Sequence, residues 1–172
     1  MLQKKQIILI STVGLLFVVA VTILFLLPDK NRLSLEVFNQ HLKIGDIKIG
    51  MPEEEVIELL GHGDYIHGFG GHGRHYAELG IQLSFPAEQD NDLFGRVVGF
   101  ELQSSEYSVY SIKVGEDRDA SVEKLLSNGF TESEFSENIF VQGEFMIGLH
   151  GEAAIEFIQV WFADKDLTDV TY

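Results

Sequence analysis

One apolar run near the start constrains this chain more than any other feature. From Ile7 to Leu27 the sequence holds no charged residue. At roughly 1.5 Å per residue, a helix over this run spans about 30 Å, the thickness of a bilayer's hydrocarbon core. Lys4 and Lys5 precede it. The pattern predicts a single N-terminal transmembrane helix over residues 7–27, after a short tail at residues 1–6.

A cleaved signal peptide is the alternative interpretation of the same run. Its apolar core would be about 7–15 residues long and would end in a small-x-small cleavage site, whereas this run is longer and has no such site. The chain has no cysteine, which excludes lipoprotein processing. The sequence therefore favours an uncleaved signal anchor. Because a short tail precedes a long C-terminal domain, we expect a single-pass protein of the cell membrane whose domain is extracytoplasmic, in a bacterial-type envelope.

The chain is strongly acidic, with 27 acidic and 12 basic residues and a net charge of −15. Such a field repels nucleic acids and anionic lipid surfaces, so neither is expected as a partner of the domain. Cations, basic peptides and cationic proteins are compatible partners, although the acidity alone would also serve solubility. The absence of cysteine excludes a disulfide framework and thiol catalysis.

After a polar neck at residues 28–42, the chain repeats a pattern. Each copy begins with a short Ile-Lys-x-Gly segment, at 47–50 and 112–115, and continues with an amphipathic helix. Pro52 suits the start of the first helix, and Asp117 or Asp119 can cap the second. Apolar residues mark the buried face of each helix: Val56, Leu59 and Leu60 in the first copy, and Val122, Leu125 and Leu126 in the second.

Both copies then change to the alternating pattern of half-buried antiparallel strands. The segments are 80–85 and 96–102 in the first copy, and 139–141, 145–149 and 155–162 in the second. We therefore expect an α+β fold in which the single N-terminal transmembrane helix is followed by two repeated helix-plus-antiparallel-sheet modules, at residues 43–108 and 109–172.

The apolar positions of the first copy form a longer pattern. It reads I-x-[IV]-G-x-x-x-x-x-V-x-x-L-L-G, continues with Tyr76 and Leu79-Gly80-Ile81-x-Leu83-x-Phe85, and ends in a V-x-x-F-x-L strand. Over most of residues 43–163 this pattern resembles the small BamE-like (SmpA/OmlA) modules and the tandem β-lactamase-inhibitor-protein-like fold. The resemblance implies a module that binds proteins at cell envelopes and has no catalytic residues.

A segment rich in glycine and histidine separates the first helix from the strand at 80–85. It holds four of the six histidines, His62, His67, His72 and His75. With Asp64 as an oxygen donor, these imidazoles could bind a divalent transition metal, although their spacing matches no compact metal motif. The other interpretations are a variable hairpin loop and a pH-responsive loop. The G-x-G-x-x-G match at 68–73 lacks the strand before it and the helix after it that a dinucleotide site requires, so no organic cofactor is expected.

Catalytic patterns are weak elsewhere. The carboxylates of Glu53, Glu54, Glu55 and Glu58 could pair as acid and base, but compensation of the helix dipole explains them without catalysis. There is no G-x-S-x-G turn and no P-loop. The aromatic residues near the end of the chain are expected in the core, or alternatively on an open sheet face as a binding platform: Phe140, Phe145, Trp161 and Phe162.

The sequence therefore predicts a non-enzymatic protein that binds or scaffolds a protein partner at the membrane or cell envelope, and that reaches the membrane through one helix. Two alternatives remain. One is an acidic inhibitor or immunity-type protein that neutralises a cationic partner. The other is a metal- or pH-responsive domain that acts through the histidine-rich segment.

Overall fold

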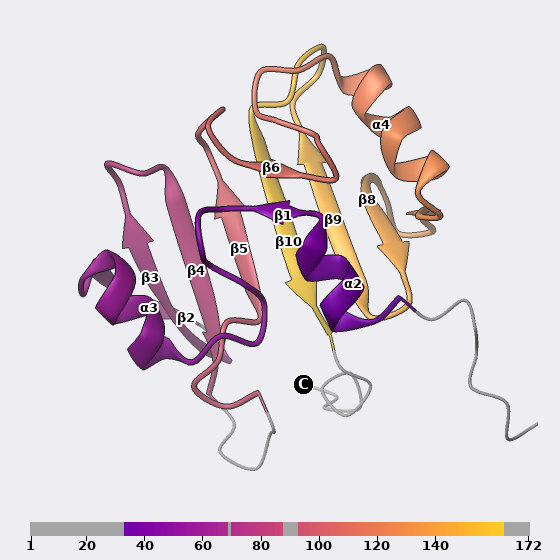
Figure 1. Cartoon of the computed structure of the whole chain (residues 1–172). Coiled ribbons are helices and arrows are strands. Elements are labelled where there is room, and N and C mark those ends of the chain that lie inside the picture. The colour runs from indigo at the N-terminus through magenta and orange to yellow at the C-terminus, as the bar shows by residue number, and fades with distance from the viewer. Residues whose placement is uncertain (1–32, 69, 88–92, 164–172) are drawn as a thin grey trace, which may run out of the picture. The chain divides into compact units, whose positions relative to one another are not determined.

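Eight antiparallel strands form one continuous sheet in the computed structural model, which describes residues 33–163 except 69 and 88–92. The strand order is β2-β3-β4-β5-β10-β9-β8-β7, so each half of the chain contributes four consecutive strands (Figure 1). The strands are β2 (Asp64–Gly68), β3 (Gly71–Tyr76), β4 (Ile81–Pro86), β5 (Gly99–Leu102), β7 (Thr131–Ser133), β8 (Ser136–Gln142), β9 (Phe145–His150) and β10 (Phe157–Phe162).

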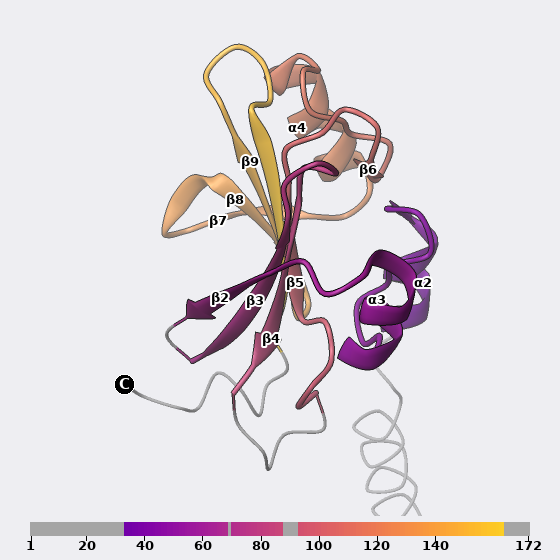
Figure 2. The ribbon, with the colours of Figure 1, turned by 90° about the vertical axis from the view of Figure 1, so that its left-hand side faces the viewer.

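Three helices and a small strand pair cover one face of this sheet (Figures 1 and 2). The helices are α2 (Leu35–Gln40), α3 (Glu53–Leu60) and α4 (Arg118–Ser127). The strand pair joins β1 (Leu42–Lys43) to β6 (Ser108–Val109). Figure 2 shows the helices on one side and the β7–β8 turn projecting to the other side. We call the helix-free side the open face.

Local signals at the ends of α3 and α4 explain where both helices begin and end. Glu53 to Glu55 fill the first turn of α3, where negative charge stabilises the helix dipole, and Gly61 ends the helix with a φ of 79°. In α4, Asp117 Oδ1 accepts a hydrogen bond from the Ala120 amide at 2.9 Å. The helices bury Val56 and Leu125, whereas Leu59 and Leu126 of the expected stripes are exposed.

The core lies between the helices and the covered face. One cross-strand row of it runs through β4, β5, β10, β9 and β8, and its members are at most 3% exposed: Leu83, Phe100, Val160, Ile147 and Phe140. Phe38 of α2 stacks on Phe145 of β9 with ring centroids 4.1 Å apart. Because one row of apolar side chains crosses both halves of the chain, the halves share a single core.

The prediction of an α+β chain with two separate modules is wrong. The fold is mainly β, and β5 pairs with β10 over four residues, so both halves belong to one sheet rather than to a repeat of BamE-like modules. The described residues all lie in one compact unit. The boundary predicted between residues 108 and 109 falls inside β6, which pairs with β1.

The predicted membrane architecture and membrane location are corrected as well. Among the described residues, no helix is long and apolar enough to cross a bilayer; the longest, α4, has 10 residues. The tail at 1–6, the apolar segment at 7–27 and the first part of the neck, 28–32, lie outside the described residues. Within the rest of the neck the structure places α2 and the start of β1.

Candidate functional site

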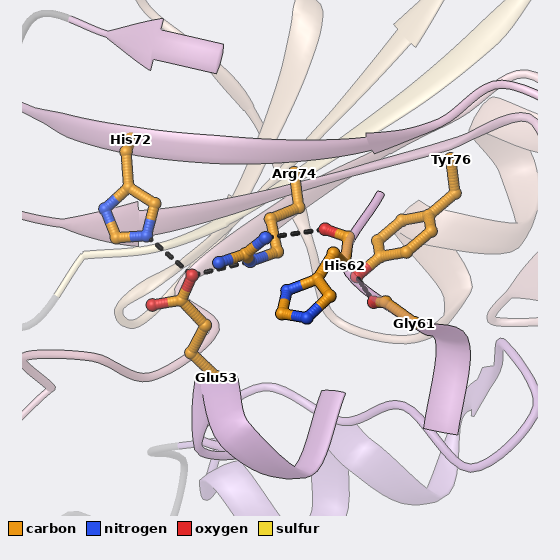
Figure 3. Close-up of polar contacts among 6 residues, drawn as sticks. All are labelled: Glu53, Gly61, His62, His72, Arg74 and Tyr76. Carbon is orange, nitrogen blue, oxygen red and sulfur yellow. Dashed lines mark hydrogen bonds and ion pairs between the residues drawn. The ribbon is translucent and has the colours of Figure 1, made fainter. Parts of the chain in front are cut away.

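Polar and aromatic side chains gather in two places, on opposite faces of the sheet. The first is the Glu53 cluster, formed by Glu53 of α3 with His72, Arg74 and Tyr76 of β3 on the covered face (Figure 3). The second is the open face, with its apolar side chains on β8, β9 and β10. The two differ in what their side chains leave available to a ligand.

The Glu53 cluster fastens both ends of α3 to β3. Glu53 Oε1 accepts hydrogen bonds from Arg74 Nε at 2.6 Å and from His72 Nε2 at 2.9 Å (Figure 3). At the other end of the helix, an Arg74 guanidinium N–H donates to the His62 carbonyl at 2.6 Å, and the Tyr76 hydroxyl donates to the Gly61 carbonyl at 3.0 Å. Alternate residues of one strand thus reach both helix termini, so these polar groups position the helix.

The electrostatics of the cluster agree with this structural role. Burial alone would raise the pKa of the Glu53 carboxyl, but the hydrogen bonds and positive charges of His72 and Arg74 outweigh it, so the pKa lies below its usual 4.5. Burial raises the pKa of the Tyr76 hydroxyl. Glu53 is therefore ionised near neutral pH with its oxygen occupied, and Tyr76 remains protonated. Neither group is prepared to abstract a proton.

The four histidines proposed as metal ligands are divided between the two faces of the hairpin. His72 lies between the rings of Tyr65 and Phe85, at 5.1 Å from each centroid, and faces the helices. His67 pairs with it across β2 and β3. His75 alternates with Arg74 and Tyr76 along β3 and therefore points to the opposite face. The His62 residue precedes β2 in a loop.

No group of three or more histidine, aspartate or glutamate side chains in the described part of the chain is placed to hold a metal ion. Asp64, the proposed oxygen donor, pairs with His75 across β2 and β3. The segment expected as a loop is instead the β2–β3 hairpin of the sheet. The metal site remains a prediction without support from this arrangement.

A shallow hollow of about 510 Å³ lies beside the Glu53 cluster, at the end of α3. Asp64, His75 and Glu78 contribute its polar groups, and Leu60, Tyr76 and Leu79 contribute apolar surface. No serine, threonine or lysine lines it, so a hydroxyl or amine nucleophile of those types is absent from its lining. The hollow is wide open, and it does not suggest a reaction.

The strand register determines which side chains lie on the open face. A row of paired residues crosses all eight strands on the side opposite the core. From β2 to β7 it consists of Ile66, Gly73, Ser84, Gly99, Trp161, Met146, Val141 and Thr131. On β3–β5 the row holds only glycine and serine, with Ile66 at the β2 edge, whereas on β8–β10 its members are large and apolar.

Apolar side chains on β8, β9 and β10 form what we call the apolar patch: Ile139, Val141, Met146, Phe157 and Trp161, all half-buried. The indole of Trp161 lies over Gly99 and Gly148. A Cβ at Gly99 would be 3.3 Å from Trp161 Cδ1, and one at Gly148 would be 3.4 Å from Trp161 Cζ3. Glycine on both neighbouring strands therefore lets the ring lie against the sheet.

Beside the patch, a carboxylate is held by neutral donors. Glu101 accepts hydrogen bonds from Gln159 Nε2 at 2.9 Å and from Gln103 Nε2 at 2.8 Å, one on each oxygen. Glu101 pairs with Gln159 across β5 and β10, in the row next to that of Trp161. Within the described ranges, the ion pairs involve Glu53 and Glu116 and none involves Glu101. The charge of Glu101 is thus uncompensated on the open face.

Among the large apolar residues that the structure describes, Phe135 has the highest exposure. Phe135, in the turn between β7 and β8, is 96% exposed. That turn projects on the same side as the open face (Figure 2). Glu132 and Glu134 precede it, and both are exposed. An exposed phenylalanine at a hairpin tip contributes nothing to the core.

Comparisons with known proteins define the fold but not the function. No family model and no curated protein matches the chain. Among solved structures, the chain is similar to the 1.5 Å crystal structure of an extracellular protein containing a SCP domain from Bacillus anthracis str. Ames. The TM-score is 0.52 at 12% identity, over 70% of this chain and 45% of that one. At that identity the likeness shows the fold alone, and it spans less than half of the other protein.

Sequence reasoning found some of these residues and missed others. It placed Phe140 and Phe145 in the core, where both are fully buried. It expected Trp161 in the core as well, with an open sheet face as the alternative, and the register puts that residue on the open face. It considered Glu53 as part of a carboxylate pair, preferred a helix-dipole role for it, and did not foresee its contact with Arg74. Glu53 lies at the start of α3 and Arg74 lies 21 residues later in β3. Nothing in the sequence around either residue indicates that the two side chains form a pair.

Proposed function

We propose that this chain is a non-enzymatic protein-binding domain and that its partner contacts the open face. The observation that carries the proposal is the apolar patch, which no helix or strand of the described residues covers (Figure 2). Alternating strands usually place polar side chains on a solvent-facing side, so a cluster containing tryptophan, methionine and phenylalanine departs from the ordinary pattern. These residue types are enriched where proteins bind one another.

The patch is built on strands inside the sheet. Each member lies on a strand with neighbours on both sides, and Trp161 is supported by two glycine-bearing strands. A partner would therefore meet side chains that lose little conformational entropy on binding. Phe135 extends the contact area at the β7 edge, where a fully exposed ring can enter an apolar pocket of the partner.

The polar clusters support a binding role over catalysis. Among the described residues, the Glu53 cluster uses its hydrogen-bonding groups to hold α3, and the hollow beside it is shallow and has no serine, threonine or lysine in its lining. The open face carries amides, glycines and apolar groups, with Glu101 beside the apolar patch and Asp64 opposite His75 on β2 and β3. In the described part of the chain, Glu101 is hydrogen-bonded to two glutamine amides and Asp64 makes no hydrogen bond to His75, so neither carboxylate is coupled to an acid or base partner.

Site-directed photocrosslinking tests the proposal. A photoreactive phenylalanine is placed at Met146, in the patch, and at Leu126, an exposed apolar position of α4 on the covered side. Irradiation in the cells that make the protein should give a discrete protein adduct from position 146 and none from position 126. Equal adducts from both positions, or none from position 146, would contradict the proposal.

A second variant tests the turn. Phe135→Ser should change the free energy of unfolding by no more than about 0.5 kcal/mol, the usual range for surface substitutions, because the side chain is almost fully exposed. It should reduce the yield of the adduct formed from position 146. An unchanged yield would remove Phe135 from the contact surface while leaving the patch in place.

A further inference from the structure

The open face carries one more inference, which rests on the proposed function and names the chemistry of the partner. We infer that the face binds a cationic protein, and that an arginine of that protein lies on the indole of Trp161 with its guanidinium directed to the carboxylate of Glu101. The occupant is thus a basic protein or peptide rather than a neutral, acidic or nucleic-acid partner.

The indole lies against the positions of Gly99 and Gly148, which carry no side chain. Trp161 is half-buried, and the strand register directs its remaining surface to the open face. Side chains at those positions would occupy the space that the ring now uses, since a Cβ at Gly99 already approaches it to 3.3 Å. Among aromatic side chains, an indole is the best surface for a cation, and arginine is the cation most often found there.

The carboxylate lies within reach of the same guest. Trp161 pairs with Gly99, and Glu101 pairs with Gln159, so Trp161 and Glu101 are diagonal neighbours on adjacent strands of one face. Diagonal neighbours have backbones about 7–8 Å apart, a separation that a guanidinium stacked on the ring can bridge. The two glutamine amides hold the carboxylate in place without neutralising it.

The surrounding charge favours a cation and disfavours an anion. None of the strand positions of the open face named by the register is lysine or arginine, and Asp64 and Glu101 are both acidic. Arg74, for example, makes its ion pair with Glu53 on the covered face rather than on the open face. With a chain charge of −15, the long-range field adds to the local one.

Arginine suits the site better than lysine. Its planar guanidinium stacks on an aromatic ring and still donates in-plane hydrogen bonds, whereas an ammonium is a compact and strongly hydrated point charge. A carboxylate whose two oxygens each already accept one amide hydrogen bond retains lone pairs for a further charged donor. The site therefore discriminates by geometry as well as by charge.

The chain's single tryptophan makes the test direct, because all indole fluorescence comes from Trp161. The full-length protein is titrated with hexa-arginine, hexa-lysine and hexa-glycine at low and at physiological salt. We expect saturable change of the Trp161 emission with hexa-arginine, weaker change with hexa-lysine and none with hexa-glycine.

Matched variants separate the local site from the overall field. Glu101→Gln should weaken hexa-arginine binding about fivefold, as expected for a partly exposed charge pair. Glu36→Gln removes the same charge from an exposed position of α2, on the covered side, and should change the affinity little. Trp161→Leu, followed by calorimetry, should weaken binding about three- to fivefold. Circular dichroism confirms that each variant is folded.

Three results would overturn the inference: equal loss of affinity in Glu101→Gln and Glu36→Gln, binding of hexa-arginine without a change in Trp161 emission, or equal binding of hexa-glycine. These results differ from failure of the proposed function. If position 146 captures an acidic or neutral protein while hexa-arginine fails to bind, the open face is a binding surface and only the cationic partner is wrong. If position 146 captures nothing, the proposed function itself fails.

Discussion

The β2–β3 hairpin and the β9–β10 hairpin lie in different halves of one sheet. They contain similar residue types, which have different roles in the two hairpins. In the first, His72 and Tyr76 face the helices and help to fasten α3. In the second, Phe157 and Trp161 face away from the helices and form part of the apolar patch. Which face a residue occupies depends only on whether its position in the strand is odd or even. Aromatic and histidine side chains therefore stabilise the fold in one hairpin and remain available to a partner in the other.

The largest expected difference between the two faces comes from substituting two adjacent residues of β9 that point to opposite sides of the sheet. Phe145 is fully buried and stacks on Phe38, whereas Met146 is half-buried in the patch. Phe145→Ala should lower the free energy of unfolding by about 3–5 kcal/mol, and Met146→Ala by about 1 kcal/mol or less. Urea denaturation measures both. Similar losses would show that the open face is as much a core surface as the covered one.

The Glu53 cluster provides the next largest effect. Glu53→Ala should cost about 2 kcal/mol, because it leaves Arg74 and His72 without their shared acceptor. We set this below the cost for a fully buried pair because these side chains keep 13–20% of their exposure. Glu54→Ala, at an exposed position of the same helical turn, should stay within about 0.5 kcal/mol. If the two variants lose the same stability, helix-dipole compensation rather than the cluster explains Glu53.

The two glycines beside Trp161, Gly99 and Gly148, test how the open face accommodates the indole. A Cβ at Gly99 would be 2.6 Å from the Val160 carbonyl oxygen, so Gly99→Ala should force a backbone shift and cost about 1–3 kcal/mol. At Gly148 the nearest atom is the end of the His150 side chain, at 2.7 Å, which can move aside. Gly148→Ala should therefore cost less than about 1 kcal/mol and shift the emission of Trp161. Thermal melts and fluorescence together separate the two outcomes, and a larger loss for Gly148→Ala would contradict this account.

The smallest effect is a pH dependence. The pKa of Glu53 is lower in the folded chain than its usual 4.5, so its ionised form favours folding. That contribution is complete above about pH 4.5 and is lost as the pH falls through the lowered value. The stability difference between the wild type and Glu53→Gln should therefore shrink as the pH is lowered from 7 to 3. Denaturation midpoints at several pH values measure it, and a constant difference would exclude the ionised carboxylate as the cause.

Some elements were predictable because their signals are local. The Asp117 cap and the buried Val56 and Leu125 positions set α3 and α4, and apolar alternation located β4, β5, β9 and β10. The β2–β3 hairpin was not predictable, because a segment of glycine and histidine has no apolar alternation. Its strands join the sheet because β3 pairs with β4, and β2 then pairs with β3. The union of the halves was missed for a similar reason, since the pairing of β5 with β10 joins residues far apart in the chain.

By itself, then, the sequence determined the acidity of the chain, the absence of cysteine, the ends of two helices and the alternation of several strands, because each depends on composition or on near neighbours. Only the tertiary structure decided which alternate residues meet the helices and which remain open. That choice depends on the register between strands and on where the helices pack, and both involve residues distant in the chain. Trp161 became a candidate binding residue, and His72 a structural one, through that choice alone.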